Sequence, residues 1–281
     1  MADTTAWAHG VDTSIPSAAR MYDYMLGGTT WFPADQAAAQ QLLKAWPLTV
    51  QACRANRSFL RRAVRYVAQQ DIRQFLDIGS GIPTMGNVHE IAQQVAPGAR
   101  VLYMDIDPVA VRHSRTILAE ANNSDATAFQ GDLADPTAVL HEIETNPDLR
   151  ALIDLERPVC LVLACVLHFL ADDQAYESAA RMIDKLTPGS YVIMTHATET
   201  DFSKQRATPA VARAYQQTTT QVRLRDRDQV ARFVAGLELV EPGLVFTPEW
   251  RPDGTSTDPE NAFADNPALS GVYAAVGYKP R

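Results

Sequence analysis

The chain has 281 residues, of which 46% are hydrophobic and 21% charged, a composition typical of a globular protein with a substantial core. Its net charge of −8 argues against a general nucleic-acid-binding protein, because an acidic surface repels phosphate backbones. The longest apolar run, residues 159–171, contains His168 and is too short to span a bilayer, so no membrane segment is expected.

Cysteine usage and the N-terminal residues bear on the compartment. Cys53, Cys160 and Cys165 form an odd, sparse set that does not predict a disulfide framework, and no Cys and His spacing resembles a zinc site. Cys160 and Cys165 lie in an apolar run and are expected to be buried core thiols. A basic region followed by an apolar stretch is missing near the N-terminus, so no signal peptide is expected. These features predict a cytoplasmic protein without a metal.

Helical segments come first along the chain. Residues 1–11 are expected to form a loose tail, and helix formers are concentrated over 34–45. A longer amphipathic helix is predicted over 52–70, where apolar residues recur at helical spacing. Since no strand is predicted before residue 74, we expect residues 1–70 to form an N-terminal helical cap and 71–281 to form the main domain.

From residue 75 onward, short apolar runs alternate with helical stretches. This alternation predicts parallel strands joined by right-handed helical crossovers. The predicted strands are 75–78, 101–104, 126–130, 159–164 and 191–195. The predicted helices between them are 88–95, 108–122, 136–145 and 173–186.

The C-terminal part departs from this alternation. A helix is predicted over 204–235, followed by strands over 237–246 and 272–278 with a polar, proline-rich stretch between them. Because no helix joins the two strands, they predict an antiparallel hairpin at the sheet edge. The predicted fold is therefore α/β: a doubly wound, mostly parallel, seven-stranded sheet with this edge hairpin and the helical cap.

Four of the predicted strands end in residues suited to ligand binding, and ligands of open α/β sheets bind at these ends. A Gly-x-Gly turn permits close approach of a ligand to the backbone. An acid about 20 residues further on suits the two hydroxyls of a ribose, and an acid at the third strand can accept from an adenine amino group. In order, the motifs are Asp77-Ile-Gly-Ser-Gly81, Asp105-Ile-Asp107, Gly131-Asp-Leu133 and Ala164-Cys-Val-Leu-His168. Together they predict a nucleoside-type ligand.

Further stretches accompany these motifs. They are Ile15-Pro-Ser-Ala-Ala-Arg-Met-Tyr-Asp-Tyr-Met-Leu-Gly-Gly28, Asn56-Arg57, Phe75-Leu-Asp-Ile-Gly-Ser-Gly-Ile-Pro-Thr84 and Trp250-Arg-Pro-Asp253. The four strand-end motifs resemble those of class I S-adenosylmethionine-dependent methyltransferases over about residues 74–200. With the other stretches, nearly the whole chain resembles an actinobacterial methyltransferase family long catalogued as a domain of unknown function.

The resemblance implies S-adenosylmethionine as cofactor and S-adenosylhomocysteine as product, bound in the domain over 71–281. The Gly79-Ser80-Gly81 turn would pass beneath the methionine part, and Asp77 would hold its amino group directly or through water. Asp105 would accept the two ribose hydroxyls. The other implied contacts are Ile106 against the adenine, Asp132 at its amino group, Leu133 beside it, and the backbone of Ala164 at the aminoacyl end.

One position departs from the pattern of the wider superfamily. Pro83 stands where a third glycine is usual, so the next helix is expected to begin near Asn87. Asn87 and Glu90 are spaced as in a capping box, which favours a helix from residue 88 onward.

A dinucleotide-binding domain is the competing interpretation, because a Gly-x-Gly turn also serves nicotinamide cofactors. Thr84 occupies the position where the full pattern requires its last glycine. The Gly131-Asp132 motif also has no role in a dinucleotide site. S-adenosylmethionine is therefore the ligand that the sequence favours.

Two histidines are candidates for the catalytic group. Methyl transfer needs alignment of the two reactants, and it needs a base only if the acceptor must lose a proton. His168 and His196 follow predicted central strands and are expected to face the cleft, where an imidazole can serve as a base. A packing or hydrogen-bonding role is an equal alternative for each.

The N-terminal signature has two interpretations. The segment with Arg20 and Tyr24 before Gly27-Gly28 is either a helix stop over a small core or a lid over the cofactor, and we favour the lid. Arg20 or Arg57 would then pair with the methionine carboxylate. Trp250 either lines the far side of the cleft or packs at the surface.

The sequence thus predicts an S-adenosylmethionine-dependent methyltransferase that acts on an oxygen or nitrogen atom of an unidentified small molecule. Nucleic acid and membranes are not expected as partners, and the oligomeric state is open. One alternative is a cyclase-like enzyme that keeps the cofactor without transferring its methyl group. Another is a binding protein that senses the cofactor.

Overall fold

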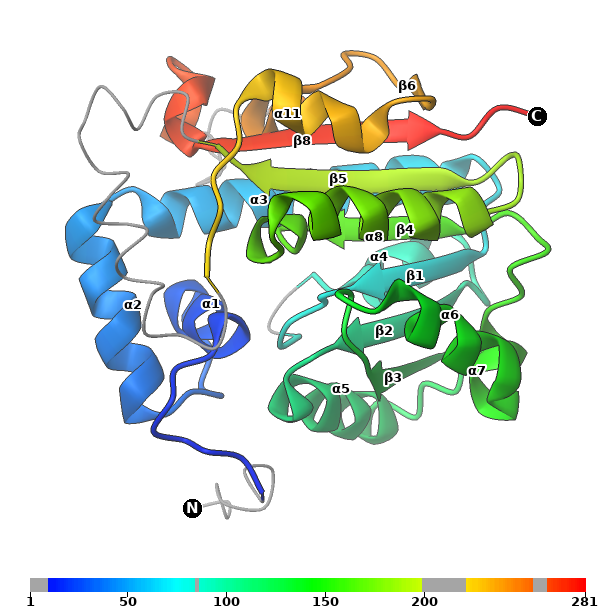
Figure 1. The fold of residues 1–281 in the computed structure, drawn as a ribbon, viewed down its shortest axis with the longest axis horizontal. Helices are drawn as coiled ribbons and strands as arrows, with labels where there is room; N and C mark the ends of the chain where they lie inside the picture. The colour runs from blue at the N-terminus through cyan, green and yellow to red at the C-terminus, as the bar shows by residue number, and fades with distance from the viewer. Residues whose placement is uncertain (1–9, 84–85, 199–220, 255–261) are drawn as a thin grey trace.

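The computed structural model describes residues 10–83, 86–198, 221–254 and 262–281, and it is built around one eight-stranded sheet (Figure 1). The strand order is β3-β2-β1-β4-β5-β8-β6, and β7 also pairs with β8. The first five strands are parallel, and β8 is antiparallel to its neighbours. The strands are β1 Gln74–Ile78, β2 Arg100–Asp105, β3 Ala126–Gln130, β4 Cys160–Ala164, β5 Tyr191–Ala197, β6 Glu238–Leu239, β7 Val245–Phe246 and β8 Val272–Tyr278.

This arrangement confirms the predicted fold class and refines its C-terminal edge. The strand expected over 237–246 is two short strands, β6 and β7, because a turn interrupts it. In this turn the Gly243 N–H donates to the Val240 carbonyl at 2.9 Å. Both short strands pair with β8, so the sheet has eight strands rather than seven.

The helices begin where the sequence supplies favourable first residues. Four of them, α2, α5, α6 and α7, start with proline, whose missing N–H needs no partner in the first turn. At α4 the Asn87 N–H donates to Glu90 Oε2 at 2.8 Å, as the predicted capping box requires. The longer helices are α1 Ala18–Leu26, α2 Pro33–Ala45, α3 Thr49–Gln69, α4 Val88–Val95, α5 Pro108–Glu120, α6 Pro136–Thr145, α7 Pro147–Leu152 and α8 Asp172–Lys185. The short ones are η2 Leu167–Phe169, α11 Arg227–Ala231, η3 Arg232–Val234, η4 Thr247–Glu249 and η6 Pro267–Ser270.

Part of the helix predicted over 204–235 is wrong. Residues 204–220 lie outside the described residues, and 221–226 are not helical. Their N–H groups are used elsewhere: that of Arg223 donates to the His168 carbonyl at 2.7 Å, and that of Arg225 to the Ala197 carbonyl at 3.4 Å. The chain regains helical structure only at α11.

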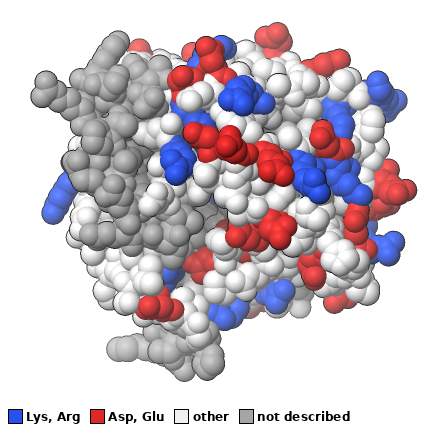
Figure 2. Space-filling model, viewed as in Figure 1, with Lys and Arg blue, Asp and Glu red and all other residues white. Residues whose placement is uncertain are grey.

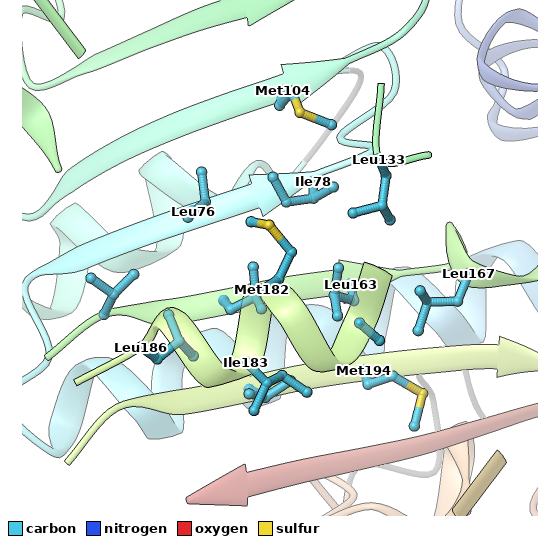
Figure 3. Close-up of a cluster of buried hydrophobic side chains, with 14 of the residues drawn as sticks. Leu76, Ile78, Met104, Leu133, Leu163, Leu167, Met182, Ile183, Leu186 and Met194 are labelled. Carbon is cyan, nitrogen blue, oxygen red and sulfur yellow. The ribbon is translucent and has the colours of Figure 1, made fainter. Parts of the chain in front are cut away.

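Each face of the sheet has its own hydrophobic core. Figure 3 shows one of them, where Met182 and Ile183 of α8, with Leu186 directly after it, face Leu163 and Ile78 of the strands. On the other face the later turns of α3, with α4 and α5, pack on β1, β2, β4 and β5. Burial on both faces explains why β4 is an uninterrupted apolar run.

Helices α1 and α2 lie beyond the carboxyl ends of the parallel strands (Figure 1). They form a small core of their own around Met21, Ala39 and Cys53. Helix α3 belongs to both parts, because Cys53 near its start packs with α1 and α2 while Phe59 and Val67 pack on the sheet. The boundary between cap and main domain at residue 70 therefore stays a prediction.

Trp250 packs against the back of α3. Its side chain is fully buried, with its ring 5.4 Å from that of Phe59 and 5.9 Å from that of Tyr66. Arg62 donates to the carbonyls of Trp250 and Thr247 and so ties this segment to the helix. Trp250 therefore has a packing role, as one of the two interpretations held, but in the interior rather than at the surface. Among the helices in the described ranges, none is long and apolar enough to cross a membrane.

Candidate active site

A cavity of about 510 Å³ opens over the carboxyl ends of the parallel strands, beneath α1, α2 and the start of α3. Its size falls in the range of about 300–1,000 Å³ that small-molecule sites span. Most residues predicted from the sequence line it: Arg20, Arg57, Asp77, Gly79, Ser80, Gly81, Asp105, Ile106, Asp132, Leu133, Ala164 and His168. Tyr24 and His196 do not.

The glycine turn after β1 forms the floor of the cavity. Gly79 has φ +69°, and a Cβ added there would lie 2.5 Å from Val166 Cγ2. Its N–H and that of Ser80 both donate to the Met104 carbonyl, at 2.8 and 3.1 Å. Glycine is therefore required at position 79 for its conformation and for the lack of a side chain.

Asp105 ends β2 inside the cavity. Its Oδ2 accepts from the Gly81 N–H and its Oδ1 from the Asp107 N–H, both at 2.8 Å. Burial raises its pKa to about 6 in spite of these two bonds. Each carboxylate oxygen has a further lone pair, so the group can accept two more hydrogen bonds from a diol.

Asp77 lies one strand away and is almost fully buried. Burial raises its pKa to about 7, the Arg57 guanidinium lowers it, and the Asp105 carboxylate raises it. A buried carboxylate that lines a cavity favours a cationic ligand there, because a nearby positive charge stabilises its ionised form.

The ends of β2 and β3 offer an apolar slot. Ile106 is 50% exposed although it is a large aliphatic residue, and it lines the cavity with the buried Leu133. Asp132 also lines the cavity, and its Oδ1 accepts from the Ala134 N–H at 2.8 Å. A Cβ on Gly131 would lie 2.7 Å from Met104 Sδ, which explains the glycine before this acid. The slot suits a flat, apolar ring with a polar edge.

The chain turns sharply after β4, where Ala164 lines the cavity. Cys165 takes φ +55°, which is uncommon for a residue with a side chain. Its N–H donates to both the carbonyl and the hydroxyl of Thr195, at 3.1 and 3.0 Å. Cys165 is only partly buried, so the expectation of a core thiol is wrong for it, while Cys160 is buried as expected.

On α1 the cavity is lined by Tyr22 rather than by the predicted Tyr24. Two residues along a helix are about 200° apart, so these two rings point to opposite sides. The ring of Tyr24 packs edge-on against Trp31, with 5.1 Å between centroids. Tyr22 donates to the Cys53 carbonyl and accepts from Asn56 Nδ2, both at 3.1 Å.

The two predicted arginines lie at different parts of the cavity. Arg20 is 2% exposed, and its Nε lies 3.5 Å from Asp35 Oδ1 and 3.3 Å from Asp107 Oδ2. It therefore joins the cap to the start of α5. Arg57 instead donates to the Gly86 carbonyl at 3.0 Å and acts on the charge of Asp77.

The two predicted histidines also differ in their position relative to the cavity. His168 lines the cavity, and its Nδ1 lies 3.5 Å from the Ala197 N–H. Burial, with His196 and Arg225 nearby, holds the pKa of His168 well below its ordinary value. The imidazole is thus neutral at pH 7. With Nδ1 facing an N–H donor, the ring proton belongs on Nε2.

His196 is fully buried and points away from the cavity, which corrects the expectation that it faces the cleft. Its Nδ1 lies 2.7 Å from the Ala197 carbonyl and therefore carries the proton, while its Nε2 accepts from Arg225 at 2.8 Å. Burial lowers its pKa to about 3. With both ring nitrogens engaged, this geometry does not support a role as base.

Arg225 is a residue that the sequence interpretation missed. Its guanidinium is 1% exposed and also donates to the carbonyls of Leu167 and Leu170 and to Asp172. These bonds hold η2, which carries His168, against the start of α8. An arginine in a segment expected to be helical gave no signal of this role.

A mostly parallel sheet in this strand order, with a glycine turn after β1 and acids at the ends of β1 and β2 and shortly after β3, defines the Rossmann-like methyltransferase class. The family described as S-adenosyl methyltransferase matches residues 4–280. The chain belongs to this family, and it is an S-adenosylmethionine-dependent methyltransferase. No curated protein matches the chain by sequence.

Solved structures agree with this assignment. A candidate methyltransferase from Thermobifida fusca YX is 38% identical, with a TM-score of 0.85 and coverage of 97% of this chain and 98% of that one. A DUF574 family protein from Streptomyces avermitilis MA-4680 is 39% identical, with a TM-score of 0.86 and coverage of 96% and 99%. Magnesium protoporphyrin IX methyltransferase from Synechocystis PCC 6803, with bound S-adenosylhomocysteine, shares the fold at 11% identity, a TM-score of 0.54 and coverage of 92% and 93%.

Proposed function

We propose that the protein transfers the methyl group of S-adenosylmethionine to an oxygen or nitrogen atom of a small molecule held in the same cavity. The observation that carries this proposal is the order of groups along the sheet. The apolar slot lies at the ends of β3 and β2. The carboxylates of Asp105 and Asp77 follow at the ends of β2 and β1, and an apolar space lies over β4, β5 and β8. A cofactor that lies along the slot and the two carboxylates would have its reactive end next to the apolar space.

The residues at these positions fit the cofactor. Asp105 would accept the two ribose hydroxyls with the lone pairs that Gly81 and Asp107 leave open. The adenine would fill the slot at Ile106, which accounts for an aliphatic side chain that is half exposed. Asp132 and Leu133 would meet its edge.

The methionine part would lie over the glycine turn. Asp77 would hold its amino group, and Ala164 would contact it through the backbone. Of the two predicted arginines, Arg57 is the better candidate for the carboxylate because it lies beside Asp77, whereas Arg20 is held by Asp35 and Asp107. Tyr24 packs against Trp31 and does not line the cavity, so it is not proposed as a cofactor contact.

When bound, the cofactor would supply an electrophilic methyl group and leave as S-adenosylhomocysteine, while the proton of the acceptor would be released to the bulk solvent. The chain itself aligns the reactants and excludes water. His168 would act as a neutral hydrogen-bond donor through Nε2 toward the acceptor. His196 would position η2 through Arg225 rather than take part in the reaction.

The cap is proposed to be the lid of this site. The observation that supports it is that α1, α2 and the start of α3 supply one wall of the cavity. The ion pair between Arg20 and Asp107 attaches this wall to the first turn of α5. A cytoplasmic location is also proposed, because Cys53, Cys160 and Cys165 are all free thiols.

Formation of S-adenosylhomocysteine together with a methylated product tests the function. The protein is incubated with S-adenosylmethionine carrying a labelled methyl group and with a panel of hydroxylated and amino compounds, and products are identified by mass spectrometry. We expect label to appear in one class of acceptor in a one-to-one ratio with S-adenosylhomocysteine. A product that forms without S-adenosylhomocysteine would overturn methyl transfer and favour a cyclase-like reaction.

A further inference from the structure

The part of the cavity over β4, β5 and β8 is apolar on both sides. Below, we call this part the acceptor chamber. It is lined by Met25, Leu42, Trp46, Ala197, Leu224 and Val272. The cap supplies the first three and the sheet side the others. The charged residues among the described lining lie elsewhere, toward the glycine turn and the ends of β2 and β3.

The outer surface of the protein is different. Figure 2 shows acidic and basic side chains spread over the described part of the face viewed there. An ion that entered the acceptor chamber would leave water without gaining an opposite charge from the described lining, which is strongly unfavourable. The described lining therefore selects an uncharged molecule.

One polar atom at the border of the acceptor chamber lacks a partner. Asn56 is 4% exposed and lines the cavity, and its Oδ1 has no hydrogen-bond partner within the described ranges. A buried carbonyl oxygen without a partner is destabilising, because it has lost its hydrogen bonds to water. Such an atom in a ligand cavity indicates a donor that arrives with the ligand.

The orientation of this amide is determined by its neighbours. The Tyr22 hydroxyl lies 3.1 Å from the Cys53 carbonyl, which can only accept, so the hydroxyl proton is directed there. The hydroxyl oxygen can then only accept from Asn56, and the atom 3.1 Å away must be Nδ2. Because Nδ2 faces Tyr22, the unpaired atom is Oδ1, a pure acceptor.

We infer that the acceptor is a neutral, largely apolar molecule whose hydroxyl or N–H group donates a hydrogen bond to Asn56 Oδ1 at the border of the acceptor chamber. This inference rests on the proposed function and specifies its substrate class. Asn56 is a positioning and specificity residue, because it orients the group that is methylated and takes up no proton. Where the donor is a hydroxyl or a secondary N–H, the methylated product has lost that proton, so the donor requirement also distinguishes substrate from product.

A matched set of ring compounds tests the inference by calorimetry with saturating S-adenosylhomocysteine at pH 7.5. The probes are 2-naphthol, 2-naphthoate, 2-naphthylmethylammonium and 2-methoxynaphthalene, which differ only in the polar group. We expect 2-naphthol to bind about tenfold more tightly than each of the other three. It keeps a hydrogen bond that 2-methoxynaphthalene cannot make, and it avoids the buried charge of the two ionic probes. Equal or tighter binding of a charged probe, or no binding of 2-naphthol, would overturn the inference.

Variants assign the hydrogen bond. Asn56→Ala should weaken 2-naphthol binding about tenfold and leave 2-methoxynaphthalene binding nearly unchanged, since only the first probe has a donor. Gln41→Ala removes an exposed amide from α2 and should change neither. Equal losses for both probes would contradict the bond. The comparison of probes on the unaltered protein keeps the test valid if Asn56→Ala does not fold.

The cofactor is measured separately. S-adenosylmethionine should bind Asn56→Ala as it binds the unaltered protein. A loss of cofactor affinity with unchanged naphthol affinity would assign Oδ1 to the cofactor and overturn the inference. If the unaltered protein fails to bind S-adenosylmethionine, the proposed function fails as well, so the two failures are distinguishable.

Discussion

The N–H group of Gly81 donates a 2.8 Å hydrogen bond to Oδ2 of Asp105. The glycine turn after β1 and the acid at the end of β2 therefore hold each other in place before any ligand arrives. The same carboxylate also accepts from the Asp107 N–H, at the start of α5. A single side chain thus fixes the turn proposed for the methionine part and the helix beside the adenine slot.

Replacement of this acid should weaken cofactor binding severely. Asp105→Ala removes the proposed acceptor of two ribose hydroxyls and the support of the Gly81 turn. We expect the Kd for S-adenosylmethionine to rise at least about 100-fold, or about 2.7 kcal/mol, as measured by calorimetry. Asp148→Ala, at an exposed site on α7 away from the cap (Figure 1), should leave the Kd unchanged. An unaltered affinity in Asp105→Ala would refute the ribose assignment.

Cofactor binding should strengthen as the pH rises. Burial raises the pKa of Asp77 to about 7 and that of Asp105 to about 6, so both acids carry protons in the empty protein at pH 5. The cationic cofactor favours their ionised forms, and binding then releases protons. A calorimetric series from pH 5 to pH 8 should show a falling Kd. Asp77→Asn should flatten the part of the curve near pH 7, and an unchanged slope would contradict the proposed amino-group contact.

The empty protein should show the opposite trend in stability. The native pKa of Asp77 exceeds the ordinary value of 3.8, so the folded chain holds its proton more tightly than the unfolded chain. This contribution to the free energy of unfolding is fully present below about pH 4 and is lost as the pH rises through about 7. Urea denaturation of the unaltered protein and of Asp77→Asn at pH 5 and pH 7.5 measures the difference. The variant should lose less stability between the two pH values, and an equal loss would assign the effect to other groups.

Gly79 should tolerate no side chain, for two separable reasons. Gly79→Ala forces a Cβ into the left-handed region, at about 1–2 kcal/mol, and against Val166 Cγ2, at about 1–3 kcal/mol more. Gly98→Ala is the matched control, because Gly98 has φ +79° with open space around it and should show only the first cost. Adding Val166→Ala to Gly79→Ala should recover part of the overlap cost in a denaturant titration, because it removes Cγ2 but leaves Val166 Cβ at 2.8 Å from the new Cβ. No recovery would contradict the contact.

Arg225 should prove essential for the stability of η2. Arg225→Met keeps an apolar stem but removes donors to two backbone carbonyls and leaves His196 Nε2 unpaired. We expect a loss of about 2–4 kcal/mol in the free energy of unfolding. Arg223→Met, two residues earlier at an exposed position, should change it by less than about 0.5 kcal/mol. Equal effects of the two substitutions would show that the buried network contributes little.

The sequence predicts the parallel part of the fold well because local signals and tertiary structure agree there. The run that forms β4 is buried on both faces, and the helices after β2 and β3 begin at Asp-Pro pairs, so pattern and packing give the same boundaries. The local pattern fails to predict the structure where hydrogen bonds to residues distant in the sequence determine the backbone. The segment over 221–226 reads as helical, yet its N–H groups pair with His168 and Ala197.

The same distinction applies to the site. Residues at strand ends, such as Asp77 and Asp105, follow from the order of the strands alone. The direction of His196 does not, because it depends on Arg225, which is 29 residues away. Helical periodicity places Tyr22 and Tyr24 on opposite sides of α1, but it does not tell which of the two sides faces the cavity. The unpaired oxygen of Asn56 cannot be predicted from the sequence, because the orientation of the amide depends on the position of the Tyr22 hydroxyl.

The position of β8 has a consequence for the order in which the protein is assembled. Strands β6 and β7 pair with β8, which lies between them and β5 in the sheet. A ribosome completes β6 and β7 well before it synthesises residues 272–278, so these two strands emerge without the strand that will bind them. The last edge of the sheet therefore closes only after β8 has left the exit tunnel, and a nascent chain halted before that point exposes β5 as an unpaired edge.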